Sequence, residues 1–363
     1  MRKHTKAIIA ILMTLVFLTA CGAGSSGSTA AGGAKEEAAA TEAGGETAEA
    51  EGEAAEAQSG GTYDICYIST VEDEWLTQLL NEMTAAGEKN GVNLDVKHAG
   101  NDSSKVLECI EQAKSEKKQA VIINVAYSND IPACIETAGD MKVVFVNRVP
   151  DAADYSLLNE NVTAVCSDEN LAGTYQGEYL AEYFTGKGQT DVKYLILQGS
   201  LNLVHTVIRS EVPVKVMKEA GLNPVEVSAV AADYNREAAK EGVKALLEDE
   251  SPEFDCIISN NDAMALGAIA ALEEAGRNPA DTPIVGIDAT ADGVQAILDG
   301  TLSMSVFQSA AGQANAAVLM AKNMIDGNPA IDGTGCEASP DCEYLLYVPF
   351  EKVTPENAAD YMK

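Results

Sequence analysis

Residues 256–276 read CIISNNDAMALGAIAALEEAG, and this stretch decides the fold. Cys256–Ser259 is a short apolar run, which is typical of a buried strand. Polar residues follow at once, and apolar residues at helical spacing then extend over Ala263–Ala275 as far as Gly276. A second apolar run begins at Ile284, so the order is strand, helix, strand. Buried strands that alternate with helices predict βαβ units and a parallel sheet.

The same alternation extends outward from this stretch in both directions. The expected strands are Tyr63–Ile68, Leu94–Lys97, Ala120–Asn124, Val143–Val146, Val162–Cys166, Tyr194–Leu197, Val225–Val230, Cys256–Ser259, Ile284–Ile287 and Ser303–Phe307. The expected helices are Trp75–Gly91, Lys105–Ser115, Ile131–Ala138, Asn170–Phe184, Ile208–Ala220, Glu237–Glu248, Ala263–Ala275, Gly293–Leu298 and Gln313–Ile325. Two runs of such units predict an α/β protein with two doubly wound parallel-sheet lobes.

Polar residues stand directly after five of these strands. They are Asn124; Asn147 and Arg148; Asn260, Asn261 and Asp262; Asp288; and Gln308. Ligands of open parallel sheets bind beyond the carboxyl ends of strands. Carboxamides both donate and accept hydrogen bonds, so this set suits a ligand covered in hydroxyls. Each position alone also fits an ordinary turn or helix cap, as Asp262 does before its helix. The joint pattern over five strand ends favours a ligand site.

Three motifs at these positions resemble the periplasmic glucose/galactose- and ribose-binding family. They are Asn260-Asn261-Asp262-Ala263-Met264-Ala265-Leu266-Gly267, Val285-Gly286-Ile287-Asp288-Ala289 and Phe145-Val146-Asn147-Arg148. The resemblance covers essentially all of the chain from Tyr63 onward. It implies a type I periplasmic-binding-protein-like fold, in which two lobes joined by a three-strand hinge close around the ligand.

This resemblance also implies where the lobes divide. The crossings are expected near Asn147–Val149, Phe307–Gln308 and Glu343–Tyr347. The N-terminal lobe is then 62–147 plus 308–343, and the C-terminal lobe is 148–307 plus 344–363.

The resemblance further implies roles for individual residues. Asn124, Asn261 and Asp288 match positions that hydrogen-bond sugar hydroxyls, Gln308 matches a hinge carboxamide, and Arg209 matches the family's sugar-binding arginine. Asp73 or Glu74 matches an acidic position in the first loop. Trp75 and Tyr234 match the aromatic platforms that sandwich the sugar ring, since aromatic faces pack against its C–H groups. The alternatives are a core residue for Trp75 and an ordinary loop aromatic for Tyr234.

Some positions depart from the glucose/galactose pattern. Leu203 and His205 replace the His and Asp that precede the arginine in that subfamily, and His205 is either a hydroxyl donor or a bystander. The calcium loop is also missing, because residues 185–190 lack the acidic ligand series. Arg148 beside Asn147 is closer to the ribose type. The expected ligand is therefore a hexose or pentose of open identity.

The N-terminus predicts export and a lipid anchor. Arg2, Lys3 and Lys6 precede an apolar run over 7–20, which is typical of a secretory leader of residues 1–20. Leu18-Thr19-Ala20-Cys21-Gly22 resembles a bacterial lipobox with Cys21 as the lipidated residue; the alternative is a plain signal peptide with a chance cysteine. Residues 22–61 are rich in Ala, Gly and Glu and predict a disordered acidic tether. We expect an extracytoplasmic protein anchored to the cell membrane.

The net charge and the cysteines exclude further kinds of partner and site. The formal net charge of −32 argues against nucleic acid as a partner. Five cysteines lie in apolar runs and are expected to be buried: Cys66, Cys109, Cys134, Cys166 and Cys256. Cys336 and Cys342 flank a loop and are compatible with a local disulfide or with two thiols. No spacing of Cys and His indicates a zinc site, and we expect no cofactor.

The remaining question is what class of protein this is. The chain has three histidines and no nucleophile elbow or phosphate loop, so an enzyme is not expected. A repressor would need a helix-turn-helix where this chain has a leader and tether. We expect a monomeric binding protein that delivers a sugar to an ABC permease. The alternatives are a sensor that presents its ligand to a receptor kinase and a binder of nucleosides or other polar solutes.

Overall fold

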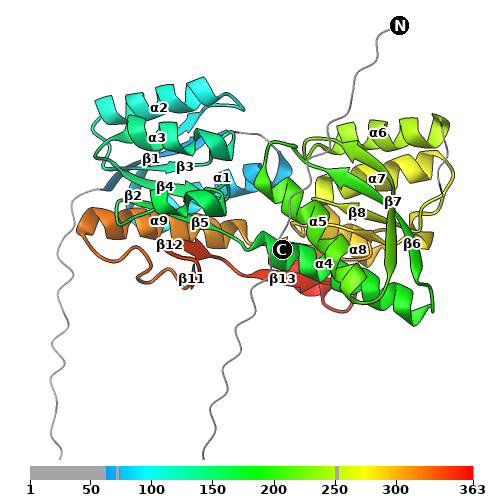
Figure 1. Cartoon of the computed structure of the whole chain (residues 1–363). Helices are drawn as coiled ribbons and strands as arrows, with labels where there is room; N and C mark the ends of the chain where they lie inside the picture. Colours follow the sequence, from blue (N-terminus) through cyan, green and yellow to red (C-terminus); the bar gives the residue numbers. More distant parts are fainter. Residues whose placement is uncertain (1–62, 71–72, 250–252, 363) are drawn as a thin grey trace, which may run out of the picture. The chain divides into compact units, whose positions relative to one another are not determined.

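A seven-stranded sheet and a four-stranded sheet organise the chain (Figure 1). The structure is a computed structural model, and it describes residues 63–70, 73–249 and 253–362. All of these residues belong to one compact unit. The predicted leader, Cys21 and the tether lie outside the described residues.

The first lobe is built on the seven-stranded sheet. Its strands are β1 (Tyr63–Ser69), β2 (Val92–His98), β3 (Ala120–Ile123), β4 (Lys142–Val146), β5 (Val162–Cys166), β11 (Glu337–Ser339) and β12 (Cys342–Tyr347). Its helices are α1 (Glu74–Lys89), α2 (Ser103–Ser115), α3 (Ile131–Ala138) and α9 (Ala310–Asp326). The strand order is β11-β12-β5-β4-β3-β1-β2, with β11 antiparallel and all other pairs parallel. Helices α2 and α3 cover one face and α1 and α9 the other (Figure 1).

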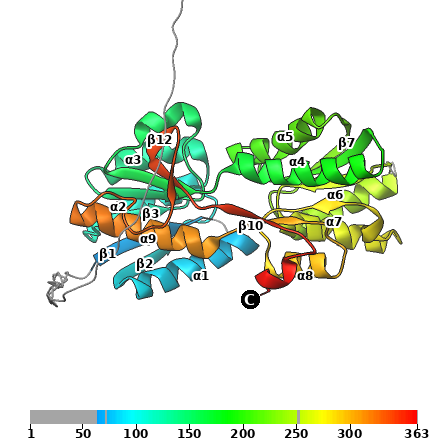
Figure 2. The ribbon, with the colours of Figure 1, turned by 90° about the horizontal axis from the view of Figure 1, so that it is seen from below.

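The second lobe repeats this arrangement on the four-stranded sheet. Its strands are β6 (Asp191–Gln198), β7 (Asn223–Ala231), β8 (Cys256–Ser259) and β9 (Ile284–Val285), in the order β7-β6-β8-β9 and all parallel. Strands β10 (Ser305–Gln308) and β13 (Phe350–Val353) form an antiparallel pair beside it. Helices α4 (Glu169–Gly186) and α5 (Val204–Glu219) cover one face; α6 (Arg236–Asp249), α7 (Asp262–Glu274) and α8 (Ala291–Leu298) cover the other (Figure 2). Short 3-10 helices occupy Ser128–Asp130, Ala152–Leu157, Pro279–Asp281 and Ala358–Tyr361.

The strands of both sheets are apolar because helices cover both of their faces. Every residue of β3 and of β8 is buried, so these strands read as continuous apolar runs. The helices begin at polar residues that end the preceding connection. Asn261 caps α7 and accepts a hydrogen bond from the Met264 amide, and Asp73 caps α1 in the same way. The carboxyl ends of the strands are thereby lined with short polar side chains.

The predicted α/β fold with two lobes is confirmed, but two predicted boundaries differ: the first crossing lies later in the chain, and residues 344–347, predicted in the C-terminal lobe, belong with β12 to the first lobe. The sequence analysis assigned residues 148–307 to the C-terminal lobe, whereas β5 pairs with β4 and with β12 in the first sheet. The chain therefore crosses after Cys166 and not at Asn147–Val149. The other crossings follow Gln308 and Tyr347, where β10 and β12 end. A buried apolar strand does not itself reveal which sheet it joins.

The cysteines behave as small apolar residues. The five expected to be buried are all buried, and burial raises the pKa of the Cys66 and Cys134 thiols to about 12. Cys336 and Cys342 are both unbonded thiols in the structure, on either side of the β11–β12 turn. Among residues 63–70, 73–249 and 253–362, no group of three acidic, His or Cys side chains could hold a metal ion. No helix in that part of the chain is long and apolar enough for a membrane span.

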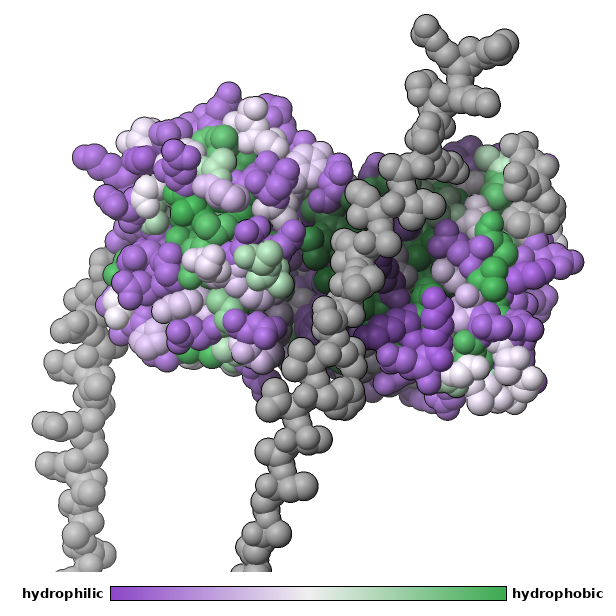
Figure 3. Space-filling view, in the orientation of Figure 1, coloured by the Kyte–Doolittle hydropathy of each residue, from purple (hydrophilic) through white to green (hydrophobic). Residues whose placement is uncertain are grey.

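The surface agrees with the acidic composition. The face shown in Figure 3 is mostly hydrophilic, with apolar residues in small separate groups. Large apolar side chains that are exposed are few among the described residues; Leu201, Val207 and Val225 are three of them. Scattered apolar residues of this kind are normal on a soluble surface.

Candidate ligand site

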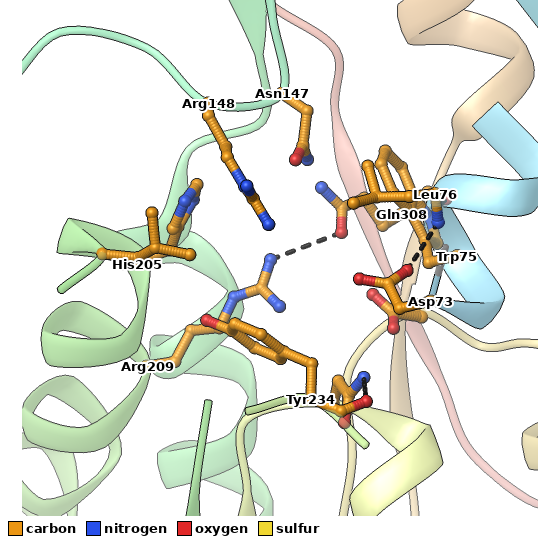
Figure 4. Close-up of a pocket in the computed structure, with 12 residues that line it drawn as sticks. Asp73, Trp75, Leu76, Asn147, Arg148, His205, Arg209, Tyr234 and Gln308 are labelled. Carbon is orange, nitrogen blue, oxygen red and sulfur yellow. Dashed lines mark hydrogen bonds between the residues drawn. The ribbon is translucent and has the colours of Figure 1, made fainter. Parts of the chain in front are cut away.

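A cavity lies between the two lobes and against the hinge. We call it the central cavity. Its wall contains side chains from both lobes: Asp73, Trp75, Leu76, Asn147, Arg148, Leu203, His205, Arg209, Tyr234, Asn261, Asp288 and Gln308 (Figure 4).

The first lobe contributes an acid and an indole from the start of α1. One carboxylate oxygen of Asp73 accepts a hydrogen bond of 2.7 Å from the Leu76 amide, which fixes this side chain at the cavity wall. Burial raises the pKa of Asp73, and backbone hydrogen bonds and two arginines oppose that rise. The Trp75 indole N–H donates to the Gln308 carbonyl at 3.1 Å. The ring is therefore held against the hinge strand, where it lines the cavity.

Asn147 and Arg148 come from the end of β4. Asn147 has a φ of 66°, in the left-handed region that asparagine tolerates. Arg148 donates through Nη1 to the carbonyls of Val125 and Ala126, at 2.8 and 3.0 Å. Its guanidinium points into the cavity (Figure 4). Burial lowers the pKa of Arg148, and the Asp73 charge opposes this.

The second lobe contributes Arg209, which is held by a partner that the sequence analysis missed. Glu169, at the start of α4, accepts from Arg209 Nε at 2.5 Å and from Nη2 at 2.8 Å. Arg209 Nη1 donates to the Asn260 carbonyl at 2.9 Å. Burial acts to raise the pKa of Glu169, but the charge of Arg209 and the hydrogen bonds to Arg209 and His205 together outweigh it and lower that pKa to about 2. This bidentate pair fixes the guanidinium before any ligand arrives.

His205 lies one turn before Arg209 on α5 and faces the same glutamate. Its Nδ1 is 3.7 Å from Glu169 Oε1. Burial lowers the pKa of His205, against the opposing effect of Glu169, so the imidazole is neutral at pH 7. A neutral imidazole has one donor and one acceptor, and both suit hydroxyl groups.

Tyr234 provides the aromatic wall of the second lobe. Its hydroxyl lies 2.7 Å from Thr206 Oγ1, and its ring packs directly on Gly199. A Cβ at position 199 would lie 2.0 Å from the ring. Tyr234 and Trp75 stand on different sides of the cavity, one from each lobe (Figure 4). Only glycine at position 199 leaves room for this ring position.

Gly199→Ala is therefore expected to displace the Tyr234 ring and weaken ligand binding about 10-fold or more, as overpacking costs roughly 1–3 kcal/mol. Gly186→Ala is the matched control, because a Cβ at position 186 meets no atom within 4 Å. Titration calorimetry with the ligand would measure both variants. Equal affinities of the two variants would contradict this role of Gly199.

Asn261 and Asp288 form the floor at the ends of β8 and β9. Asn261 uses Oδ1 to cap α7, and its Nδ2 donates to the Tyr234 carbonyl at 3.4 Å. Asp288 is buried, with a φ of 116°. Burial raises the pKa of Asp288 well above its usual value; Arg209 opposes this rise, while Asp262 and Asp73 add to it.

Gln308 stands where β10 leaves the second lobe. Its Oε1 accepts from Arg209 Nη2 at 3.3 Å (Figure 4). Its Nε2 is buried and has no hydrogen-bond partner among the described residues. A buried amide donor without a partner costs about 1–3 kcal/mol. An acceptor atom of a ligand at this position would remove that cost.

Ten of the twelve predicted site residues line the central cavity, and two do not. Glu74 lies outside it and is largely exposed, so Asp73 is the first-loop acid that faces the cavity. Asn124 lies behind the wall, where it accepts from Thr70 Oγ1 at 2.6 Å and donates to the Val146 carbonyl at 3.2 Å. It also approaches Asn147 Oδ1 at 3.5 Å, so it supports Asn147 from behind.

Asp262 lies beneath the floor and is not the cap of α7. It is the first residue of that helix, is fully buried, and accepts from Ser305 Oγ at 2.6 Å and from the Thr290 amide at 2.9 Å. No cation contacts it among the described residues. Burial raises its pKa to about 7.

This folded-state pKa lies above the ordinary value of an aspartate, so folding favours the protonated form of Asp262. The contribution of Asp262 to the free energy of unfolding is therefore fully present below about pH 4 and is lost as the pH rises through about 7. Asp262→Asn, which can bond to the same Ser305 and Thr290 groups, is expected to reduce the fall in melting temperature between pH 5 and 8. Asp102→Asn, at an exposed helix cap, serves as the control. An unchanged pH profile in Asp262→Asn would contradict the assignment.

An ion pair joins the lobes beside the cavity. Arg236 of α6 donates through Nη2 to Glu74 at 2.7 Å and to Asp292 at 2.9 Å. Glu74 belongs to the first lobe, whereas Arg236 and Asp292 belong to the second. We call these three residues the latch. All three side chains are at least one-third exposed, so solvent screens the attraction.

Glu74→Gln is therefore expected to speed ligand release only about 2- to 5-fold, and the effect should vanish at high salt. Glu178→Gln is the matched control, because Glu178 pairs with Lys352 at 2.9 Å within the second lobe. Stopped-flow dissociation at low and high salt would compare them. The same acceleration in both variants would show that the interlobe position of the latch has no importance.

The cavity suits a small ring that carries hydroxyl groups. It combines two aromatic walls, two arginines, two carboxylates and three carboxamides. No serine, threonine or cysteine lines it beside His205, so the wall offers no aliphatic hydroxyl or thiol nucleophile for this imidazole to activate. The chemistry on offer is recognition by hydrogen bonds and stacking.

Comparison with known proteins agrees with this geometry. The sequence profile described as "Periplasmic binding protein domain" matches residues 66–329. A Rhizobium meliloti protein described as rhizopine-binding is 30% identical over 81% of this chain and 90% of its own length. The D-galactose/methyl-galactoside binding periplasmic protein of Haemophilus influenzae is 25% identical over 75% of this chain and 83% of its own. An ABC transporter solute binding protein from Bacillus halodurans, solved with bound myo-inositol, is 26% identical, with a TM-score of 0.71 over 84% of this chain and 99% of that one.

Proposed function

The chain belongs to the periplasmic binding protein family, and from that premise we propose that it captures a monosaccharide or similar small polyol between its lobes for a membrane importer. The observation that carries the proposal is Gln308. Its Nε2 is a buried donor with no partner, at the junction of the two lobes and beside Arg209. A hydroxyl oxygen of the ligand would complete this hydrogen bond.

The ligand class follows from what the wall offers. Stacking on Trp75 and Tyr234 suits the C–H faces of a ring, and the amides and charged groups suit its edges. The relatives support the same class, since one is named for galactose and methyl-galactoside, and one solved relative contains myo-inositol. Hexoses, pentoses and cyclitols are therefore the first candidates.

Capture proceeds by closure of the lobes around the three hinge crossings. Both lobes bring hydrogen-bonding groups to the cavity, so only the closed form satisfies all hydroxyls of the ligand. A wrong epimer leaves a buried donor or acceptor unpaired, which costs about 1–3 kcal/mol. A few side chains can thereby separate stereoisomers.

The location is part of the same proposal. Family membership supports an extracytoplasmic protein, and the lipobox-like sequence at Cys21 supports a lipid anchor. Mass spectrometry of the membrane-extracted protein should find two or more acyl chains on Cys21. A soluble, unmodified N-terminus would remove the anchor from the proposal and leave sugar capture untouched.

A thermal-shift screen of the purified protein tests the function. A ligand that binds only the folded state raises the melting temperature by mass action. We expect a selective rise with one or a few members of a panel that contains D-galactose, D-ribose, D-xylose, D-fucose and myo-inositol. A flat response to this panel and a rise with nucleosides would overturn the sugar assignment.

A further inference from the structure

A second cavity adjoins the central cavity. We call it the side cavity. The two cavities share Asn147 and His205 as lining residues, so these two side chains form the wall between them. The side cavity lies along the crossing after β5, where Ser167 and Glu169 line it, and it extends to Ile208 of α5. Nothing in the capture of a bare monosaccharide uses this space.

Asn147 and His205 are the residues that line both cavities. Asn147 is held from behind by Asn124, and Nδ1 of His205 lies 3.7 Å from Glu169 Oε1. A substituent on a ring in the central cavity would pass between these two side chains and enter the side cavity.

The walls of the side cavity differ from those of the central cavity. Apolar and aromatic side chains form part of the lining, with Val149, Ile208 and Tyr347 among them. These surfaces suit an alkyl group or the C–H face of a second ring. A channel for water alone would not need apolar and aromatic surfaces of this kind.

The charge of the side cavity is acidic. Asp151, Asp168 and Asp341 line it, and its described lining contains no lysine or arginine. Glu169 also lines the side cavity, but its carboxylate is already paired with the guanidinium of Arg209. His205 adds no positive charge at pH 7, because burial lowers its pKa. An anionic group would therefore meet only like charges there.

We propose that the side cavity is a subsite for a neutral or cationic substituent on the ring held in the central cavity, so that the physiological ligand is a substituted sugar or cyclitol such as a glycoside. This inference rests on the proposed function and names its substrate class. It also excludes phosphate esters and uronic acids whose anionic group would occupy this position. Asp151, Asp168 and Asp341 set this charge preference, and Asn147 and His205 set the direction of the substituent.

Matched ligand series test the proposal by titration calorimetry. For whichever of D-galactose, D-ribose and myo-inositol binds, the series consists of the parent, each mono-O-methyl and mono-O-(2-aminoethyl) positional isomer, and the available monophosphates. We expect at least one aminoethyl isomer to bind as tightly as the parent or more tightly, and its phosphate counterpart about 100-fold more weakly. Loss of binding in every substituted isomer, with the parent intact, would overturn the subsite and leave the proposed function standing. Failure of all three parents would instead count against the proposed function.

A pair of variants on one helix localises the effect. Ile208→Trp fills the side cavity, whereas Val207→Trp places the same bulk on the exposed side of α5. The parent ligand should bind both variants within about 2-fold of wild type, and the aminoethyl isomer should lose about 10-fold or more only in Ile208→Trp. Val204→Phe provides a second filling variant if Ile208→Trp melts below wild type. Equal losses for parent and substituted ligand in both filling variants would overturn the proposal.

Discussion

Arg209→Met is expected to weaken ligand binding about 100-fold and to destabilise the protein by roughly 3–5 kcal/mol. The second effect arises because Arg209 is the charge partner of Glu169, which is buried and receives two of its hydrogen bonds. Removal of the guanidinium leaves that carboxylate unpaired in the interior. The same change removes the anchor of Gln308 Oε1 and a donor from the cavity wall. Chemical denaturation and titration calorimetry would measure the two effects.

A second substitution separates the two effects of Arg209. In the double variant Glu169→Gln with Arg209→Met, neither buried charge remains, so stability should return toward wild type, because replacing both members of a buried pair is often nearly neutral. Affinity should stay low, since the cavity still lacks its guanidinium. Recovery of affinity together with stability would show that Arg209 matters for folding and not for the ligand.

The residues that the sequence proposed for the site reach the central cavity where the end of a strand sets their position. Asn147, Asn261 and Asp288 follow strands and Gln308 is the last residue of one, and parallel strands bring their carboxyl ends to one edge. Asn124 occupies the same kind of position, yet its side chain turns to Thr70 and the β4 backbone. Which way such a side chain turns depends on neighbours that the strand pattern does not specify.

Glu169 was missed for a related reason. It is the first residue of α4, where an acidic residue is ordinary on account of the helix dipole. Its contact with Arg209 spans 40 residues of sequence and exists only because α4 and α5 pack together. Apolar spacing predicts both helices and not the register between them. Leu76 and Leu203 were also missed, because apolar wall residues cannot be distinguished from core residues by sequence alone.

The lobe boundary shows the same limit at the level of topology. Most strands and helices were predicted to within a few residues, as with α3 and β5, whose bounds agree, but β11 and β13 were not predicted. The sheet that β5 joins is decided by its pairing with β4 and β12, and β12 lies about 180 residues away in sequence. Local pattern fixes the elements, whereas long-range pairing divides them between lobes.

Asp288→Asn is expected to weaken ligand binding at least about 100-fold, since hydrogen bonds to a charged group contribute roughly 1.5–3 kcal/mol each. The same substitution is expected to make the folded protein more stable at neutral pH. The opposite sign of the stability change follows from the surroundings of Asp288. Burial raises its pKa well above the usual value, and Asp262 and Asp73 repel its charge. The amide removes that cost and keeps nearly the same shape. Asparagine also tolerates the positive φ of 116° at this position.

The comparison with Asp299→Asn makes this prediction specific. Asp299 is exposed at the end of α8, so its substitution changes the formal charge equally without touching the cavity. We expect it to alter neither affinity nor melting temperature measurably. If Asp288→Asn kept its affinity within about 3-fold of wild type, Asp288 would be a strained structural residue and not a ligand acceptor. If affinity fell and stability rose, the carboxylate would be retained at position 288 for the ligand alone, because the fold is better without it.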